Sequence, residues 1–173
     1  MTQPPPRLST VRAQRATLDD LERVYRARVR QFVRIARAMT GDAELARDAV
    51  QEAFARAVRA RASFRGEGSL DAWVARIVVT AARDLVRRQA SSFDAAGGPL
   101  EEGRAEPVEA EPELRRAIRR LPERQRLALF LRYYADFDYR QIAEALAIER
   151  GTVSATLHAA HAGILKLLEE VPR

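Results

Sequence analysis

The stretch DYRQIAEALAIERGTVSATL, which runs from Asp138 to Leu157, has the spacing of a helix-turn-helix. Asp138 is a suitable N-cap, because its carboxylate can accept hydrogen bonds from the free amides of a first helical turn. Ile142 and the leucine four residues later share one face of that helix. Ala147 and Ile148 fall at the bend, and a second helix opens at residues 151–152. The pattern is typical of DNA-binding domains whose second helix enters the major groove. A plain helical hairpin in an all-helical protein is the alternative.

The second helix of this stretch has an inward and an outward face. Its apolar stripe comprises Val153, Leu157, Ala160, Ile164 and Leu168. The outward face then comprises Thr152, Ser154, Ala155, His158 and Ala159, and it contains no Arg. The nearest cations are Arg150, just before this face, and Arg140 in the preceding helix. We expect these two Arg and the amides of the helix N-terminus to hold phosphates. Ser154, Ala155 and His158 would then meet base edges.

The charge pattern indicates a polyanionic partner. The 173-residue chain is 47% hydrophobic, enough to bury a core, and its net charge is +6. Of its 30 basic residues 29 are Arg, which suits phosphate contacts. Residues 1–90 carry a net charge of +8, residues 91–113 of −6 and residues 114–173 of +4. The acidic segment is either a solvated linker or the occupant of a cationic channel.

Several classes of protein are excluded or disfavoured. The chain has no Cys, so it holds no disulfide, Cys-ligated zinc or thiol switch, and two His argue against any other metal site. No apolar run approaches the roughly 18 residues of a membrane span, and the Pro- and Arg-rich start is not a secretory signal. No Walker loop, dinucleotide fingerprint or nucleophile–base set is present. We therefore expect a cytoplasmic protein without enzymatic activity, metal, cofactor, small-molecule substrate or membrane insertion.

The N-terminal half is predicted to be helical after a disordered tail at residues 1–16. Thr17 and Asp20 form a capping box that opens a first helix. Gly41 ends that helix, and Asp42 caps a second helix over about residues 43–60. The apolar side of the first helix comprises Leu21, Val24, Tyr25, Val29, Phe32, Ile35, Ala36 and Met39.

The second helix carries an acidic group, Asp48, Gln51 and Glu52, in a stretch with no paired Arg at hand. This group either solvates the helix or forms a docking surface. A loop, SFRGEGS at residues 63–69, follows, and Ser69 can cap a third helix to about Gln89.

The third helix combines an apolar and a basic stripe. The buried stripe is expected to comprise Trp73, Ile77, Ala81 and Leu85, widened by Val74, Val78 and Ala82. The polar stripe comprises Arg76, Thr80, Arg83 and Arg87. A basic helix that follows a Gly-rich loop with an aromatic residue suits single-stranded nucleic acid. A solvated helix face with an Arg-rich end is the alternative.

Residues 91–111 are predicted to be a flexible acidic linker. Beyond it, Pro112 and Pro122 start two more helices, which lead into the helix-turn-helix. The predicted fold is all-α, with one helical domain at residues 17–90 and a second, which contains the helix-turn-helix, at residues 112–170.

Together these segments resemble the extracytoplasmic-function (ECF) class of bacterial sigma factors, in the sigma-70 family. DAVQEAFARAV at residues 48–58 resembles the helix that binds core polymerase. FRGEGSLDAWVARIVVTAARDLVRR at residues 64–88 resembles the promoter-melting loop and the minus-ten helix of region 2. Residues 121–168 resemble region 4, which binds the minus-thirty-five element. The resemblance covers about four-fifths of the chain, in the family's order and spacing.

The resemblance implies roles for the ambiguous residues. Asp48, Gln51 and Glu52 would contact core RNA polymerase, and the acidic linker would thread through its active-site cleft. Residues 64–69 would pocket a base flipped from the non-template strand. The minus-ten contacts would be Phe64, Arg65, Trp73, Arg76, Thr80, Arg83 and Arg87. The minus-thirty-five contacts would be Arg140, Arg150, Thr152, Ser154, Ala155 and His158. An anti-sigma factor would be a further partner.

The chain departs from the family pattern at several positions. Thr80 replaces the usual Asn, which puts the minus-ten base preference in doubt. Gln141 stands where the family often has Glu. Ala147 replaces a usual Gly, so we expect a slightly different turn. Thr156, Ala159 and His161 stand where Arg is frequent, so we expect weak DNA binding by this domain alone.

The sequence therefore predicts a subunit that directs core polymerase to promoters and helps to melt the minus-ten element. Two other classes stay open. A stand-alone helix-turn-helix regulator would explain the C-terminal third, but it has no use for the loop and basic helix around Trp73. A protein-interaction module without DNA binding would explain why the second helix of the helix-turn-helix, the recognition helix, carries so few charges.

Overall fold

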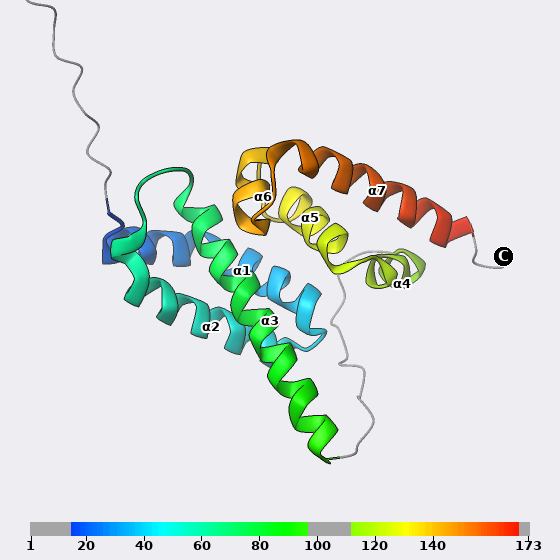
Figure 1. The fold of residues 1–173 in the computed structure, drawn as a ribbon, viewed down its shortest axis with the longest axis horizontal. Coiled ribbons are helices and arrows are strands. Elements are labelled where there is room, and N and C mark those ends of the chain that lie inside the picture. The colour runs from blue at the N-terminus through cyan, green and yellow to red at the C-terminus, as the bar shows by residue number, and fades with distance from the viewer. Residues whose placement is uncertain (1–14, 97–111, 170–173) are drawn as a thin grey trace, which may run out of the picture.

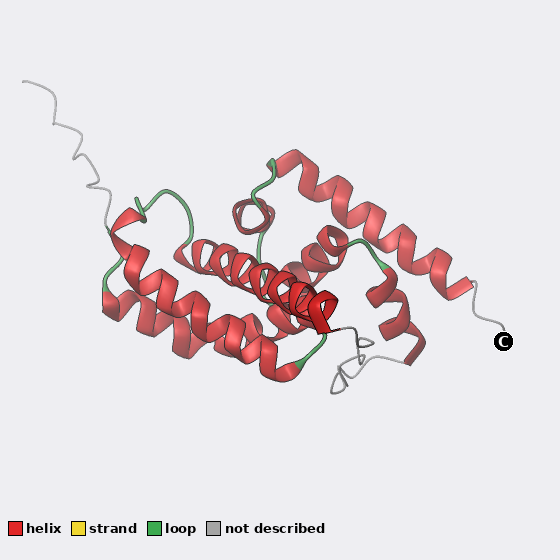
Figure 2. Ribbon diagram, turned by 60° about the horizontal axis from the view of Figure 1, so that its bottom comes forward, coloured by secondary structure: helices red, strands yellow, loops and turns green. Residues whose placement is uncertain are grey.

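The computed structural model describes residues 15–96 and 112–169. Within these two ranges the secondary structure is helical, without strands (Figure 1, Figure 2). The elements are α1 Leu18–Thr40, α2 Ala43–Ala60, the short 3-10 helix η1 Arg61–Ser63, α3 Leu70–Ala96, α4 Pro112–Arg120, α5 Glu123–Tyr133, α6 Tyr139–Leu146 and α7 Arg150–Glu169. The predicted all-α fold is confirmed.

The first two helices begin and end where their capping residues predict. The Thr17 hydroxyl accepts from the Asp20 amide at 3.1 Å, and the Asp20 carboxylate accepts from the Thr17 amide at 2.9 Å. Gly41 ends α1 in the left-handed conformation, with φ at 71°, where a side chain would be strained. Asp42 then accepts from two amides of the first turn of α2. Local chemistry therefore fixes both ends of α1 and the start of α2.

Helices α1, α2 and α3 form an N-terminal bundle. Phe32 and Ile35 of α1 are completely buried, and each side chain contributes roughly 1.5–3 kcal/mol by leaving water. Small residues of α2 let the three helices approach closely, and Ala46, Ala49, Ala53 and Ala57 are all fully buried. Tyr25, predicted to be inward, is 46% exposed and packs edge-on against Phe54.

The buried face of α3 is rotated from the predicted one. Val74, Val78, Ala81 and Ala82 are fully buried, whereas Trp73, Ile77 and Leu85 are only partly buried. The prediction placed Trp73, Ile77 and Leu85 at the centre of the core. It was wrong because α3 packs against α6 as well as α1 and α2, so the buried face is centred on Val74, Val78 and Ala82 and leaves Trp73, Ile77 and Leu85 at its edge.

Two predicted boundaries also differ. Helix α3 continues to Ala96, beyond the predicted end near Gln89, so the first residues assigned to the linker are helical. Ala16, assigned to the disordered tail, is buried. Residues 1–14 of that tail, residues 97–111 of the linker and residues 170–173 lie outside the described residues.

The C-terminal domain is built from α4 to α7. The Asp138 carboxylate accepts from the Gln141 amide at 2.8 Å, and the Gln141 side chain accepts from the Asp138 amide at 2.9 Å, so α6 begins with a complete capping box. The turn after α6 packs Ile148 against the core, as predicted. Helix α7 begins at Arg150, one residue earlier than predicted. Phe137, between α5 and α6, is fully buried.

The two domains pack directly against each other. Figure 1 shows α3 crossing α1 and α2, with its N-terminal end next to α6. Helix α1 contacts α5 in the same interface. The buried residues of both domains form one continuous hydrophobic cluster. The described structure is therefore a closed arrangement of two helical domains.

Candidate nucleic-acid interface

The loop before α3 and the first turns of α3 surround two adjoining cavities. A cavity of about 470 Å³ is lined by Arg15, Ala62, Ser63, Phe64 and Arg65. A second, of about 320 Å³, is lined by Arg56, Ala60, Ser63, Trp73, Arg76, Ile77 and Thr80. Ser63 belongs to both. Five of the seven predicted minus-ten residues therefore line one hollow surface: Phe64, Arg65, Trp73, Arg76 and Thr80.

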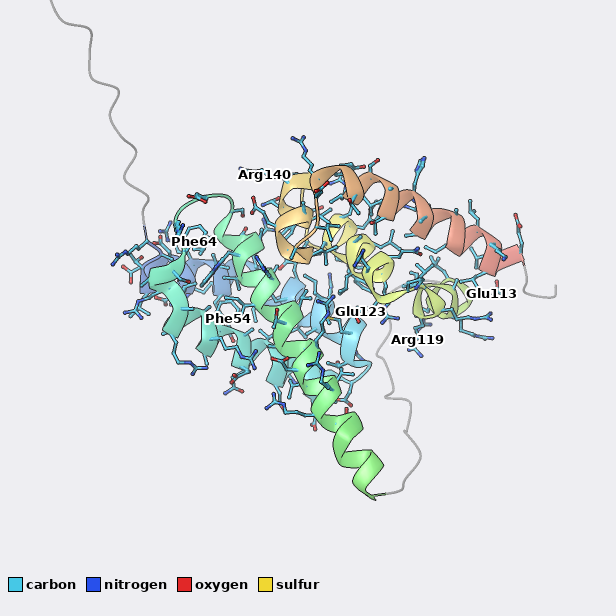
Figure 3. All side chains as sticks on the ribbon, viewed as in Figure 1. Phe54, Phe64, Glu113, Arg119, Glu123 and Arg140 are labelled. Atoms are coloured by element: carbon cyan, nitrogen blue, oxygen red, sulfur yellow. The ribbon has the colours of Figure 1, made fainter. Side chains whose placement is uncertain are left out.

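Phe64 lines the first cavity and Trp73 lines the second. Their ring centroids lie 5.7 Å apart, with the ring planes tilted by 58°. Figure 3 shows Phe64 beside the start of α3, at the base of the loop. Both side chains are partly buried, so each keeps some surface for a further flat ring. Two aromatic rings bordered by Arg suit a nucleobase and its phosphates.

Thr80 presents less hydrogen-bonding capacity than its position suggests. It is exposed, but its hydroxyl donates to the Arg76 carbonyl at 2.9 Å. An oxygen engaged in this way keeps only acceptor capacity for DNA.

Arg83 and Arg87 do not reach the cavities. The Arg83 guanidinium donates to the Glu123 carboxylate of α5 at 2.7 Å, across the boundary between the domains. Arg87 is exposed one turn further along α3. Of the predicted minus-ten residues, five therefore line the cavities, Arg83 lies at the boundary between the domains, and Arg87 is exposed further along α3.

The acidic group on α2 is not free of basic partners, contrary to the prediction. Arg56 donates to Glu52 at 2.8 Å and to Asp84 of α3 at 2.7 Å. These hydrogen bonds lower the pKa of the Glu52 and Asp84 carboxyls below their ordinary values and raise that of Arg56. The prediction failed because it overlooked the i,i+4 spacing of Glu52 and Arg56 on one helix face. Asp48 and Gln51 are exposed, as predicted.

Arg56 is a site residue that the sequence interpretation missed. It lines the smaller cavity, and its two carboxylate partners connect that cavity to the acidic group of α2. The i,i+4 pairing was visible in the sequence, whereas the contact with Asp84 depends on the packing of α2 against α3.

The recognition helix, α7, presents the outward face that the sequence predicted. Val153, Leu157 and Ala160 are buried. The six predicted minus-thirty-five residues are all exposed: Arg140, Arg150, Thr152, Ser154, Ala155 and His158. Figure 3 shows Arg140 projecting outward from α6. Ser154, Ala155 and His158 lie one turn or less apart on α7, which matches a helix laid in the major groove.

Of the expectations about departures from the family pattern, one stays a prediction and one was wrong. Thr156 is buried, and its hydroxyl donates to the Thr152 carbonyl at 2.8 Å, so it lies off the outward face of α7, and weak DNA binding by this domain alone stays a prediction. Ala147 takes φ 53° and ψ 48°, the left-handed conformation that favours glycine. The turn therefore keeps a glycine-like geometry despite the Cβ.

Comparison with known proteins agrees with this geometry. Residues 24–92 match the sigma-70 region 2 model, and residues 112–161 match the sigma-70 region 4 model. The ECF RNA polymerase sigma factor SigM of Mycobacterium tuberculosis is 33% identical over 152 residues, which cover 85% of this chain and 76% of SigM. The chain belongs to the ECF sigma factors. The sigma-E factor of Escherichia coli K12 is 33% identical over 134 residues, 68% of this sigma factor and 70% of its own chain.

Two solved structures share the fold of this sigma factor. RpoE of Bartonella quintana, crystallised with the anti-sigma factor NepR, gives a TM-score of 0.73 at 19% identity and covers 90% of this chain and 100% of RpoE. CnrH, in complex with the cytosolic domain of CnrY, gives a TM-score of 0.67 at 19% identity and covers 91% and 92% of the two chains.

As an ECF sigma factor, the protein directs core RNA polymerase to promoter DNA in transcription initiation. The match to region 2 argues against the stand-alone regulator, which needs no such region. In the described part of the chain no helix has the length and apolarity of a membrane span. Those residues also contain no cluster of His, Asp and Glu that could hold a metal ion.

Proposed function

We propose that this sigma factor divides its work among three surfaces. The exposed group of Asp48 and Gln51, with Glu52 beside it, binds core polymerase. The cavities around Phe64 and Trp73 take a base and the backbone of the non-template minus-ten strand, with Arg65, Arg76 and Thr80 at their rim. The outward face of α6 and α7 reads the minus-thirty-five element.

The single observation that supports the minus-ten assignment best is the shared hollow surface. Two aromatic rings 5.7 Å apart border cavities of about 470 and 320 Å³, and Arg15, Arg56, Arg65 and Arg76 are among the lining residues. An extruded base needs a pocket with a flat apolar wall, and the strand that carries it needs cations for its phosphates. Arg83 and Arg87 would meet the strand further along α3 once Arg83 leaves Glu123.

The remaining assignments follow from the family. Residues 17–90 and 112–170 act as region 2 and region 4, and the intervening acidic segment follows the basic cleft of the polymerase. The protein catalyses no reaction itself and acts in the cytoplasm with the polymerase. An anti-sigma factor controls it, as the anti-sigma factor NepR binds RpoE, which shares this fold.

The docking surface is tested with a single charge reversal. Asp48→Arg should weaken binding to core polymerase at least about tenfold, because a like charge at a complementary interface costs several kcal/mol. Asp48 is preferable to Glu52, since reversing Glu52 would also break the Arg56 network. The measurement is the dissociation constant from fluorescence anisotropy of labelled sigma factor.

The matched control is Glu22→Arg, the same reversal at an exposed position of α1. It should leave the affinity unchanged. Equal affinities for Asp48→Arg and wild type, with unchanged circular dichroism, would remove α2 as the docking surface.

A further inference from the structure

The corner where α4 meets α5 carries a dense group of Arg. Half of the twelve residues at positions 115–126 are Arg, and Glu123 is the one acidic residue among them. Glu123 accepts from Arg83 of α3 at 2.7 Å. Within residues 15–96 and 112–169, none of these Arg forms an ion pair with a carboxylate. We call them the basic corner: Arg115, Arg116, Arg119, Arg120, Arg124 and Arg126.

Helix α4 is packed against α7, so the basic corner has a fixed place in the domain. Ala117 and Leu121, on the inward side of α4, are buried. Gly163 of α7 allows this close approach, because a Cβ there would lie 2.7 Å from the Leu121 side chain. The opposite side of α4 presents Arg116, Arg119 and Arg120 to solvent, and Arg124 is exposed on α5.

Two Arg of the basic corner are partly buried without the partners that a buried cation needs. The Nε atoms of Arg115 and Arg126 have no hydrogen-bond partner in the described part of the chain. Arg126 donates from another nitrogen to the Arg119 carbonyl at 2.9 Å. Burial lowers the pKa of the Arg126 guanidinium, and the nearby Glu123 offsets this effect only in part. A partly buried cation without a paired carboxylate costs stability, and a bound anion would reduce that cost.

The composition of the basic corner favours the phosphate backbone of duplex DNA as that anion. A protein partner would need apolar or aromatic anchors, and no large exposed hydrophobic residue lies at described positions 112–126. Single strands are bound by aromatic stacking, and residues 112–129 contain no aromatic residue. Arg residues four apart on α4 are separated by about 6 Å along the helix, and each guanidinium can bind a phosphate at two points.

The basic corner is distinct from the face proposed to read the minus-thirty-five element. Ser154 and Ala155 lie near the start of α7, whereas α4 packs beside Gly163. Figure 3 shows Arg119 beside the C-terminal half of α7, at the other end of the domain from Arg140. The outward face of α7 has no Arg between residues 151 and 159, so this domain separates its base-reading face from its densest positive charge.

We infer that the basic corner binds the phosphate backbone of promoter duplex that flanks the minus-thirty-five element. The corner supplies the electrostatic attraction that the Arg-poor face of α7 lacks. Because phosphates carry no sequence information, this contact adds affinity for any duplex. The inference goes beyond the three proposed surfaces, and it does not depend on which bases α7 reads.

The test compares the salt dependence of duplex binding by the full chain. The variant combines Arg116→Gln, Arg119→Gln and Arg120→Gln, because Gln keeps a high helix propensity. The probe is a fluorescent 20-base-pair duplex of scrambled sequence, titrated by anisotropy at several salt concentrations. The slope of the logarithm of the binding constant against the logarithm of the salt concentration should become shallower by about 2.7, and the affinity at low salt should fall at least about tenfold.

The matched control removes three charges elsewhere, with Arg23→Gln, Arg26→Gln and Arg30→Gln on exposed positions of α1. Its slope should change far less, because Arg23 and Arg26 already pair with carboxylates of α1. Equal changes in the two triple variants would mean that net charge alone attracts DNA, and the inference would be wrong. Arg116→Gln alone should change the slope by about 0.9, which keeps the test decisive if circular dichroism shows the triple variant unfolded.

Two further measurements test the kind of anion and its place. Poly-glutamate at the same concentration of charges should displace the duplex severalfold less well than unlabelled duplex does, because a flexible polypeptide loses more entropy on binding. Equal displacement would assign the corner to an acidic protein and overturn the assignment to DNA.

Hydroxyl-radical footprinting with holoenzyme on a cognate promoter then locates the contact. The triple variant of α4 should lose backbone protection beside the minus-thirty-five element and keep it within the element. Unchanged protection beside the element, or a loss confined to the element, would contradict the inference.

Discussion

At the scale of single residues, two backbone positions outside glycine take positive φ in the described chain: Asp136 and Ala147, both at 53°. Asp tolerates this conformation because its short polar side chain can bond locally, whereas Ala has no such compensation. Ala147 nevertheless donates its amide to the Ala143 and Glu144 carbonyls and ends α6 there. The turn of the helix-turn-helix is thus imposed by its surroundings and not by local preference.

Ala147→Gly should therefore stabilise the protein. Relief of the left-handed strain, less the greater chain entropy of glycine, should raise the free energy of unfolding by about 1 kcal/mol. Ala162→Gly, the same substitution at an exposed position within α7, should lower it by about 1 kcal/mol. Urea denaturation followed by circular dichroism measures both. A loss of stability in Ala147→Gly would show that the turn is not strained.

Arg56 controls the ionisation of two carboxyls. Its hydrogen bonds lower the pKa of Glu52 and Asp84, so these groups stabilise the fold above their ordinary pKa values. That contribution is lost as the pH falls through the lowered, folded-state pKa. In Arg56→Met both pKa values should rise toward their ordinary values, as measured by carbon-detected NMR titration of the side-chain carboxyls.

Arg59→Met is the control for this titration, because Arg59 lies 3.7 Å from Glu52 and is mostly exposed. It should move the pKa of Glu52 little and that of Asp84 not at all. If Arg56→Met left both values where they are in the wild type, Arg56 would not connect α2 to α3.

At the scale of elements, local signals predicted where helices start, and tertiary packing decided what they bury. Thr17, Gly41, Asp42 and Asp138 marked helix ends correctly, because capping depends on neighbours within four residues. The inward face of α7 was predicted correctly at Val153, Leu157 and Ala160, whereas Thr156 is buried although it was not assigned to that face. The rotation of α3 and the pairing of Arg83 with Glu123 could not be predicted, because both depend on a helix more than 30 residues away.

Another prediction concerns the outward face of the recognition helix, α7. Ala155 and Ala159 are both exposed on α7. Ala155→Arg should change the selected minus-thirty-five sequence toward guanine at one position, because Arg bonds the major-groove edge of guanine at two points. Ala159→Arg should add about one phosphate contact. The variant should then bind all DNA sequences more tightly. The slope of the logarithm of the binding constant against the logarithm of the salt concentration should become steeper by about 0.9.

Selection from a randomised minus-thirty-five library with the polymerase holoenzyme distinguishes these effects. The Ala159→Arg library should converge on the wild-type sequence. If the DNA sequence selected with Ala155→Arg were the same as with the wild type, this face would not read bases. That result would support the hypothesis of a protein-interaction module.

At the scale of the whole molecule, the packing of the two domains leaves some of the proposed surfaces exposed and places another at the boundary between the domains. The acidic group on α2 and the outward face of α7 are exposed in the closed arrangement, whereas the start of α3 is held by α6. Ser69 contacts Gln141 and Glu144 although it lies more than 70 residues from both in sequence. The sequence predicted each domain, but it held no local signal for the contact between them.

The central claim is that the surface around Phe64 and Trp73 opens promoter DNA for this sigma factor. Permanganate footprinting of thymines in the minus-ten element, with holoenzyme on a cognate promoter, tests it most directly. Phe64→Ala should reduce the reactive open complex at least about tenfold while closed-complex binding changes little, because stacking on one base is worth roughly 1–3 kcal/mol. Circular dichroism reports whether this variant keeps its fold, because the loss of the Phe64 ring 5.7 Å from Trp73 would itself alter Trp fluorescence.

Tyr133→Ala serves as the control, because it removes an exposed aromatic ring from α5 in the other domain. Its footprint should match that of the wild type. Strong thymine reactivity with Phe64→Ala, equal to the wild type, would contradict the account, and so would an equal loss of closed-complex binding and melting.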